Sequence, residues 1–81
     1  MNLTVRLFAR ARDLAGADHI AVEMPAGATV ADLRRRLVAQ HPTLGGLASR
    51  CAVAVGAEFA DDNHVLTEAA EIALLPPVSG G

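Results

Sequence analysis

The sequence of 81 residues contains no lysine, tryptophan or tyrosine, and its only aromatic residues are Phe8 and Phe59. All seven cationic side chains are arginines and the formal net charge is −2, so the strong positive field that nucleic-acid binding needs is missing. Cys51 is the single cysteine, which excludes an internal disulfide and gives no sign of export. No apolar stretch approaches the roughly 18 residues of a membrane span, and no signal-like pattern opens the chain. We therefore expect a cytoplasmic protein that binds neither nucleic acid nor membrane.

Side chains that could form a catalytic or metal site are also scarce. His19, His41 and His64 fall in different predicted elements, without a second ligand at metal-binding spacing. Asp61-Asp62 sits in a predicted turn, and Gly45-Gly46 lacks the following Lys and Ser/Thr of a phosphate loop. A domain of this size has no room for an enclosed substrate cavity with its own supporting residues. The sequence thus predicts no metal site and disfavours an enzyme that works alone.

Alternating apolar residues predict a sheet. Strands are expected at Asn2–Phe8, His19–Met24, Cys51–Val55 and Glu71–Leu75. A short helix is expected over Ala9–Ala15, ending at Gly16. The segment around Phe59 is predicted to be short and irregular, with Val65-Leu66 pairing weakly.

The best helix signal begins at Thr29, where Asp32 completes a capping box with Asp in place of the usual Glu or Gln. Apolar residues then follow at helical spacing, at positions 30, 33, 37 and 38, until His41-Pro42 ends the pattern. Arg34-Arg35-Arg36 is interpreted as a solvated face, with Arg36 pairing with Asp32. Residues 43–50 are predicted to form a loop with at most a single helical turn, and Cys51 a small buried residue at a strand start.

These elements predict an α+β fold. Their order favours a mixed sheet of four to five strands with one main helix across one face, and the right-handed crossover rule allows the last strand to lie parallel to the first. That arrangement is the ubiquitin-like β-grasp. We expect a β-grasp domain over residues 1–75 and an extended tail over residues 76–81.

The tail ends in Gly80-Gly81, and its terminal carboxylate is the candidate reactive group. Two residues without side chains can pass through a channel that would exclude any Cβ atom, so a second protein could reach Gly81. Pro76 and Pro77 favour a stiff, extended leader through Val78 and Ser79, and six residues can project about 20 Å. The alternative is that these glycines have no function, either as a poorly ordered terminus or as small residues left over from cloning.

Strand parity predicts a docking surface at the root of this tail. If Leu3, Val5 and Leu7 face the helix, Phe8 falls on the opposite face, and Leu75 does so at the end of the last strand. Phe59 borders the same side, so the three residues could form one apolar patch. The alternative is that Phe8 is partly buried under the Phe59 segment.

The chain resembles the small subunit of molybdopterin synthase, the MoaD type within the MoaD/ThiS sulfur-carrier family. The resemblance rests on Leu7-Phe8-Ala9-Arg10-Ala11-Arg12-Asp13-Leu14-Ala15-Gly16, Val53-Ala54-Val55, Leu66-Thr67 and the ending Leu75-Pro76-Pro77-Val78-Ser79-Gly80-Gly81. Two positions depart from the family pattern: Gly56 stands where relatives often have Asn, and Leu74-Leu75 replaces a commonly aromatic pair.

The resemblance implies a function in molybdenum cofactor biosynthesis. A MoeB-type activating enzyme would use ATP to adenylate Gly81, and sulfur would replace AMP to give a thiocarboxylate. The chain would then dock on a large, MoaE-type subunit, in a heterotetramer, and pass sulfur to cyclic pyranopterin monophosphate. Gly80 would give clearance, Pro76 to Ser79 would form the leader, and Phe8, Phe59, Leu75 and Arg12 would lie at the interface. No permanently bound cofactor is implied.

Two other functions stay open at this point. The first is a carrier with the same activation chemistry but another acceptor, in thiazole, cysteine or transfer-RNA thiolation. The second is a ubiquitin-like binding module that is never thiolated, or a protein modifier, which without lysine could not build lysine-linked chains on itself.

Overall fold

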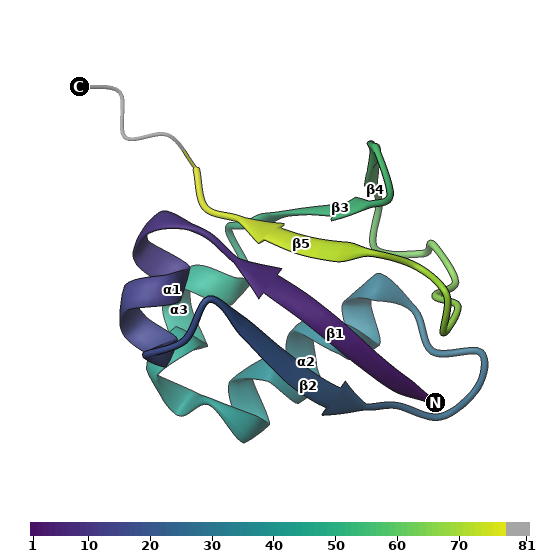
Figure 1. The fold of residues 1–81 in the computed structure, drawn as a ribbon, viewed down its shortest axis with the longest axis horizontal. Helices are drawn as coiled ribbons and strands as arrows, with labels where there is room; N and C mark the ends of the chain where they lie inside the picture. The colour runs from purple at the N-terminus through teal and green to yellow at the C-terminus, as the bar shows by residue number, and fades with distance from the viewer. Residues whose placement is uncertain (78–81) are drawn as a thin grey trace.

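The computed structural model describes residues 1–77 and consists of one mixed sheet with the helices on one of its faces (Figure 1). The elements in chain order are β1 (Asn2–Leu7), α1 (Ala9–Ala15), β2 (His19–Glu23), α2 (Val30–Gln40), the 3-10 helix η1 (Pro42–Leu44), α3 (Gly45–Ala48), β3 (Ala52–Val55), β4 (Glu58–Ala60) and β5 (Ile72–Leu75). Within residues 1–77, no helix is long and apolar enough to cross a membrane. The predictions for Val78, Ser79, Gly80 and Gly81 lie outside the described residues.

The sheet has five strands in the order β2-β1-β5-β3-β4. β1 pairs antiparallel with β2 and parallel with β5, while β3 pairs antiparallel with both β5 and β4. The predicted parallel pairing of the first and last strands is confirmed, and so is the β-grasp arrangement. Because β1 and β5 run in the same direction, their carboxyl ends lie at the same edge of the sheet (Figure 1).

The core lies between the sheet and α2. Leu3, Val5 and Leu7 of β1 are buried while their neighbours are exposed, which is the alternation that the sequence predicts. Val30, Leu33 and Leu37 of α2 meet them with no exposed surface. Cys51 is also buried, as predicted. Among the described residues the buried set is wholly apolar, so the fold is held by packing rather than by a buried polar network.

The start of α2 confirms the predicted capping box. The side chain of Thr29 accepts a hydrogen bond from the backbone N–H of Asp32 at 3.3 Å. In return, Oδ2 of Asp32 accepts from the backbone N–H of Thr29 at 2.9 Å and from its hydroxyl at 3.1 Å. Asp therefore replaces Glu in this motif without losing the reciprocal pair.

The prediction of a loop over residues 43–50 is wrong, apart from the single helical turn that it allowed, which is α3. This segment forms η1 and α3, because Pro42 is pre-set for the first position of a helix and Leu44, Leu47 and Ala48 bury one side of it. Thr43 adds a tie to α1 by donating from its hydroxyl to the carbonyl of Leu14 at 2.8 Å.

The prediction of an irregular segment around Phe59 is also wrong. Gly56, with φ of 64°, makes a tight turn after β3, and Val55 and Glu58 pair directly across it. The segment therefore returns as the short edge strand β4.

The interpretation of the arginine run as a solvated face fails at Arg34. Its side chain is only 18% exposed and donates to the carbonyls of Ala48 at 2.6 Å and Cys51 at 2.7 Å, and to Oδ1 of Asp62 at 2.9 Å. Asp32 pairs with Arg35, one turn along the helix, rather than with Arg36. Arg34 thus fastens α2 to the carboxyl end of α3 and to the residue that precedes β3.

Candidate docking face and tail root

The candidate site is built on the sheet face that points away from α2. On this face the strand register aligns Arg6, Ala73, Ala54 and Phe59 in one row across β1, β5, β3 and β4. The next row toward the tail pairs Leu75 with Ala52, and Phe8 continues β1 on the same side. We call the apolar members of these two rows the outer patch: Phe8, Ala52, Ala54, Phe59, Ala73 and Leu75.

In the outer patch, Ala52, Ala54 and Ala73 lie between two large exposed side chains, and we call these three alanines the floor of the patch. Phe59 is 74% exposed and Phe8 is 37% exposed, whereas alanines occupy the positions between them. Adjacent strands lie about 4.8 Å apart, so Phe59 on β4 and Phe8 beyond β1 are separated by about 14 Å across the sheet. Since β5 and β3 lie between them, the segment around Phe59 does not cover Phe8. The alternative that this segment buries Phe8 is therefore not supported.

The backbone after β1 holds Phe8 in place. Phe8 is the N-cap of α1, and its carbonyl accepts from the backbone N–H of Ala11 at 3.1 Å and of Arg12 at 3.4 Å. Ala9 has φ of 50°, the only positive value among the described non-glycine residues, and this tight bend starts the helix immediately after the ring. The guanidinium carbon of Arg6 lies 5.4 Å from the centre of the Phe8 ring, within the range of a cation–π contact.

The other two residues predicted at the interface are Arg12, on α1, and Leu75, on β5. Arg12 is exposed in the last turn of α1, one helical turn beyond Phe8. Leu75 is half-buried at the end of β5, followed by a half-buried Pro76 and an exposed Pro77. The tail thus leaves the sheet beside Phe8, at the edge where β1 and β5 end and β3 begins (Figure 1).

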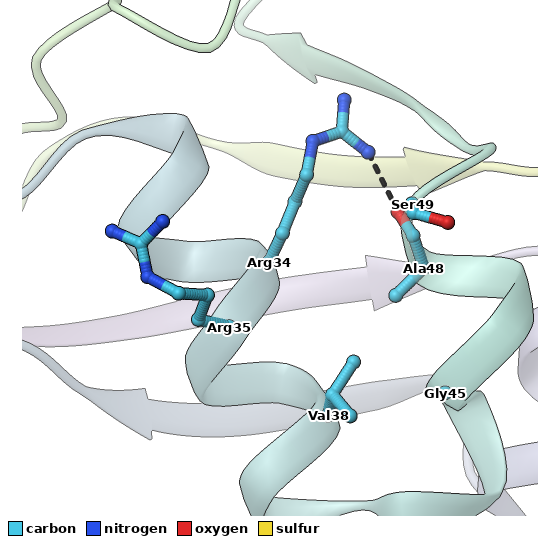
Figure 2. Close-up of a pocket in the computed structure, with 6 residues that line it drawn as sticks. All are labelled: Arg34, Arg35, Val38, Gly45, Ala48 and Ser49. Carbon is cyan, nitrogen blue, oxygen red and sulfur yellow. Dashed lines mark hydrogen bonds between the residues drawn. The ribbon is translucent and has the colours of Figure 1, made fainter.

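A groove lies between α2 and α3, on the side of the molecule that carries the helices. Figure 2 shows this groove of about 290 Å³, which is lined by Arg34, Arg35, Val38, Gly45, Ala48 and Ser49. Its best-placed polar group, the guanidinium of Arg34, is already bound to Ala48 and Cys51. The hydroxyl of Ser49 donates to the carbonyl of Gly46 at 3.3 Å. The groove therefore offers neither an acid/base group nor an activated nucleophile.

The pKa values of Asp32 and Cys51 are shifted by their surroundings. Hydrogen bonds from the backbone and side chain of Thr29, with help from Arg35, hold the pKa of Asp32 below its usual value. Burial raises the pKa of the Cys51 thiol, although Arg34 and Arg50 oppose that shift. Over residues 1–77, no group of three His, Cys, Asp or Glu side chains is placed to hold a metal ion.

The five-stranded mixed sheet with its helices on one face defines a small domain of the ubiquitin-like β-grasp class. The sequence matches the ThiS family over residues 5–81, and the chain belongs to that family. The molybdopterin synthase sulfur carrier subunit of Arabidopsis thaliana is 35% identical over all of this chain and 84% of its own length. The subunit of the same name from Chlamydomonas reinhardtii is 34% identical over the full length of both chains. The predicted resemblance is confirmed, and these relatives support a sulfur-carrier role.

Solved structures agree with the fold. SAMP1 from Haloferax volcanii superposes with a TM-score of 0.85 at 32% identity, over the whole of both chains. A chain in the complex of subunits 1 and 2 of the molybdopterin-converting factor from Helicobacter pylori has a TM-score of 0.70 at 26% identity, also over both full lengths. In the Helicobacter pylori structure, a chain with this fold is part of a complex of two different subunits.

Sequence reasoning missed two features of the candidate site. It did not place Arg6 over Phe8, because a contact between residues two apart on one strand face depends on the side-chain rotamer. It also did not recognise the floor of Ala52, Ala54 and Ala73, although small residues at alternate strand positions were a readable signal.

Proposed function

We propose that this chain is the sulfur-carrier subunit of a molybdopterin synthase, with Gly81 carrying the sulfur as a terminal thiocarboxylate. The observation that supports this most strongly is the ThiS family match, which runs through the tail to residue 81. The full-length relatives named as molybdopterin synthase sulfur carrier subunits support the choice of pathway. The described residues offer no other reaction centre.

The chemistry of a carboxylate explains why the chain would need an activating enzyme. A free carboxylate resists nucleophilic attack because its charge is delocalised and its leaving group is poor. In the proposed step, the Gly81 carboxylate attacks the α-phosphate of ATP on a MoeB-type enzyme and releases pyrophosphate. Hydrosulfide from a sulfur donor then attacks the acyl carbon, the bond to AMP breaks and AMP leaves, and loss of the S–H proton gives the thiocarboxylate. The acid, base and phosphate-binding groups would all belong to the partner.

The thiocarboxylate sulfur would next pass to cyclic pyranopterin monophosphate, bound on a large MoaE-type subunit. Each transfer returns a carboxylate on Gly81, so two charged chains supply the two sulfurs of the dithiolene. In a heterotetramer, each large subunit would receive the tail of one carrier. The two-subunit assembly of the Helicobacter pylori relative supports a large-subunit partner.

The outer patch would form the contact that aims the tail. Phe8 and Leu75 flank the point where the chain leaves the sheet, Phe59 lies across the alanine floor, and Arg12 follows Phe8 by one helical turn. Exposed aromatic residues beside small ones fit the pattern of an interface anchor and its socket. Gly80 would then give the clearance that lets Gly81 enter the partner's active site.

Reconstitution with a defined acceptor tests the pathway. The thiocarboxylated chain is mixed with a large-subunit homologue and cyclic pyranopterin monophosphate, and molybdopterin formation is followed with loss of the thiocarboxylate. We expect about two carrier chains consumed for each molybdopterin, one for each dithiolene sulfur. A thiocarboxylate that stays intact with this acceptor, but is consumed by a thiazole or transfer-RNA thiolation system, would move the chain to another pathway.

A second candidate function follows from the likeness to SAMP1, a small archaeal modifier protein. In that case the activated Gly81 would be transferred to an amine of another protein. Incubation with the activating enzyme and candidate target proteins separates the two functions, because a modifier leaves a stable conjugate whereas a carrier leaves none.

A further inference from the structure

The nucleophiles of the chain itself bear on the fate of its activated terminus. Acyl-adenylates and other activated acyl groups react with amines and thiols as well as with their intended acceptors. The sequence has no lysine and one cysteine, so its amines and thiols reduce to the α-amine of Met1 and the thiol of Cys51.

Cys51 lies close in space to the root of the tail. It directly precedes Ala52, whose partner across the sheet is Leu75, the last residue before the tail. Yet Cys51 is only 3% exposed, and it packs in the core. Its backbone is tied on both sides: its N–H donates to the carbonyl of Leu47 at 3.1 Å, and its carbonyl accepts from Arg34 at 2.7 Å. Burial also raises the pKa of this thiol, which reduces the reactive thiolate fraction.

The α-amine of Met1 is less able to react with the activated terminus, because it lies at the end of β1 away from the tail root. β1 and β5 are parallel, so Met1 lies about 23 Å from the level of Phe8, at about 3.3 Å per residue. The six residues that follow Leu75 span about 20 Å when fully extended. The ammonium group also donates to the carbonyl of Met24 at 2.6 Å. Figure 1 shows the amino terminus at the edge of the sheet opposite the tail root.

We infer that this chain is built to be inert toward its own activated terminus: it has no lysine, its thiol is buried and its amine is remote. The inference rests on the proposed activation of Gly81. Its consequence is specificity, because an activated carrier that cannot acylate itself keeps its acyl group for an external acceptor.

A chemical thioester tests this inference without the activating enzyme. The full chain is prepared with Gly81 as the thioester of 2-mercaptoethanesulfonate, freed of excess thiol and followed by intact mass in native buffer. We expect hydrolysis to the free acid as the only reaction. An internal acyl transfer would instead displace the small thiol, form an amide or a new thioester, and give a product about 18 Da lighter than the free acid.

Two matched variants show whether the missing lysine matters. Ala52 is exposed and lies beside the tail root, so Ala52→Lys places an amine within reach, while Ala52→Arg adds the same charge without a nucleophile. We expect Ala52→Lys to form the lighter ring product at least about tenfold faster than wild type, because the two groups share one molecule. Ala52→Arg should behave like wild type. An Ala52→Lys chain as unreactive as wild type would overturn the inference, since a lysine beside the tail root would then not be acylated by the Gly81 thioester.

Denaturant tests whether the fold hides Cys51. In guanidinium chloride, the wild-type thioester should exchange onto Cys51 and give the lighter product, and Cys51→Ala should not. Self-acylated monomer from the native wild-type chain, at a rate near that of Ala52→Lys, would contradict the inference. So would an unfolded wild-type chain that stays as unreactive as Cys51→Ala. Because no sulfur donor or acceptor takes part, these outcomes are independent of whether the chain is a sulfur carrier.

Discussion

The guanidinium of Arg6 lies over the ring of Phe8, with 5.4 Å between the guanidinium carbon and the ring centre. Both residues point to the sheet face away from α2, so the contact supports the ring on the side where the tail leaves. A cation–π contact at an exposed site is worth about 0.5–1 kcal/mol, which is enough to bias the ring position without burying the ring. Phe8 is thus held partly exposed beside the tail root, where a partner could reach it.

Replacing Phe8 tests the outer patch directly. Phe8→Asp should weaken binding of the large-subunit homologue by at least about tenfold, because it puts a charge at an apolar contact. Thermal unfolding should shift by only a few degrees, since the ring is partly exposed. Isothermal titration and a circular dichroism melt measure the two effects. Loss of the folded state would show instead that Phe8 belongs to the core.

Phe59 tests whether the patch extends across the sheet to β4. Phe59→Glu should leave the unfolding free energy within about 0.5 kcal/mol of wild type, because the side chain is 74% exposed, and should weaken partner binding. Val65→Glu is the matched control, since Val65 is also an exposed apolar residue, at 54%, but lies next to Thr29 rather than on the outer patch. Equal loss of binding in both variants would argue against a specific patch.

Arg34 should matter for stability, unlike its neighbour Arg36. Arg34→Ala leaves the carbonyls of Ala48 and Cys51 without their donor, which costs about 1–3 kcal/mol of unfolding free energy for each buried group left unpaired. Arg36→Ala removes an exposed side chain and should change that free energy by less than about 0.5 kcal/mol. Urea denaturation of the two variants measures the difference. Similar midpoints would restore the interpretation of the whole run as a solvated face.

Asp32 gives a defined pH dependence. Its pKa is held below the ordinary value of 3.8 in the folded chain, so the ionised form stabilises the fold above that value. As the pH falls below 3.8, the unfolded chain takes up the proton first and the stabilisation is lost. The stability advantage of wild type over Asp32→Asn should therefore be full at pH 7 and should shrink in acid. Urea titrations at pH 7 and below 3.8 measure it, and an advantage that grows in acid would contradict the assignment.

The sequence was most informative where one residue type controls the local structure. Thr29 and Asp32 predicted the start of α2, and the alternation of Leu3, Val5 and Leu7 predicted both the strand and its buried face. It was less informative where tertiary contacts decided the outcome, as in residues 43–50, which were predicted to be mainly a loop. α3 forms because Leu47 and Ala48 find a core to bury against, and nothing in their immediate neighbours shows that core.

The candidate site shows the same division. Parity alone put Phe8 and Leu75 on the face away from the helix, since Phe8 directly follows one alternating strand and Leu75 is the last residue of another. The partners of Arg34 lie 14, 17 and 28 residues away, so local spacing could only pair it with solvent. Hydrogen-bond partners so far apart in sequence can be identified only when the complete fold is known.

The most direct test of the account is the intact mass of the chain after incubation with its activating enzyme, ATP and a sulfur donor. We predict a gain of about 16 Da, the exchange of one carboxylate oxygen for sulfur at Gly81. A variant with one alanine added after Gly81 should fold normally and gain nothing. A wild-type chain that keeps its mass beside an activating enzyme shown to charge another carrier would contradict the account, and so would an extended variant that is charged equally well.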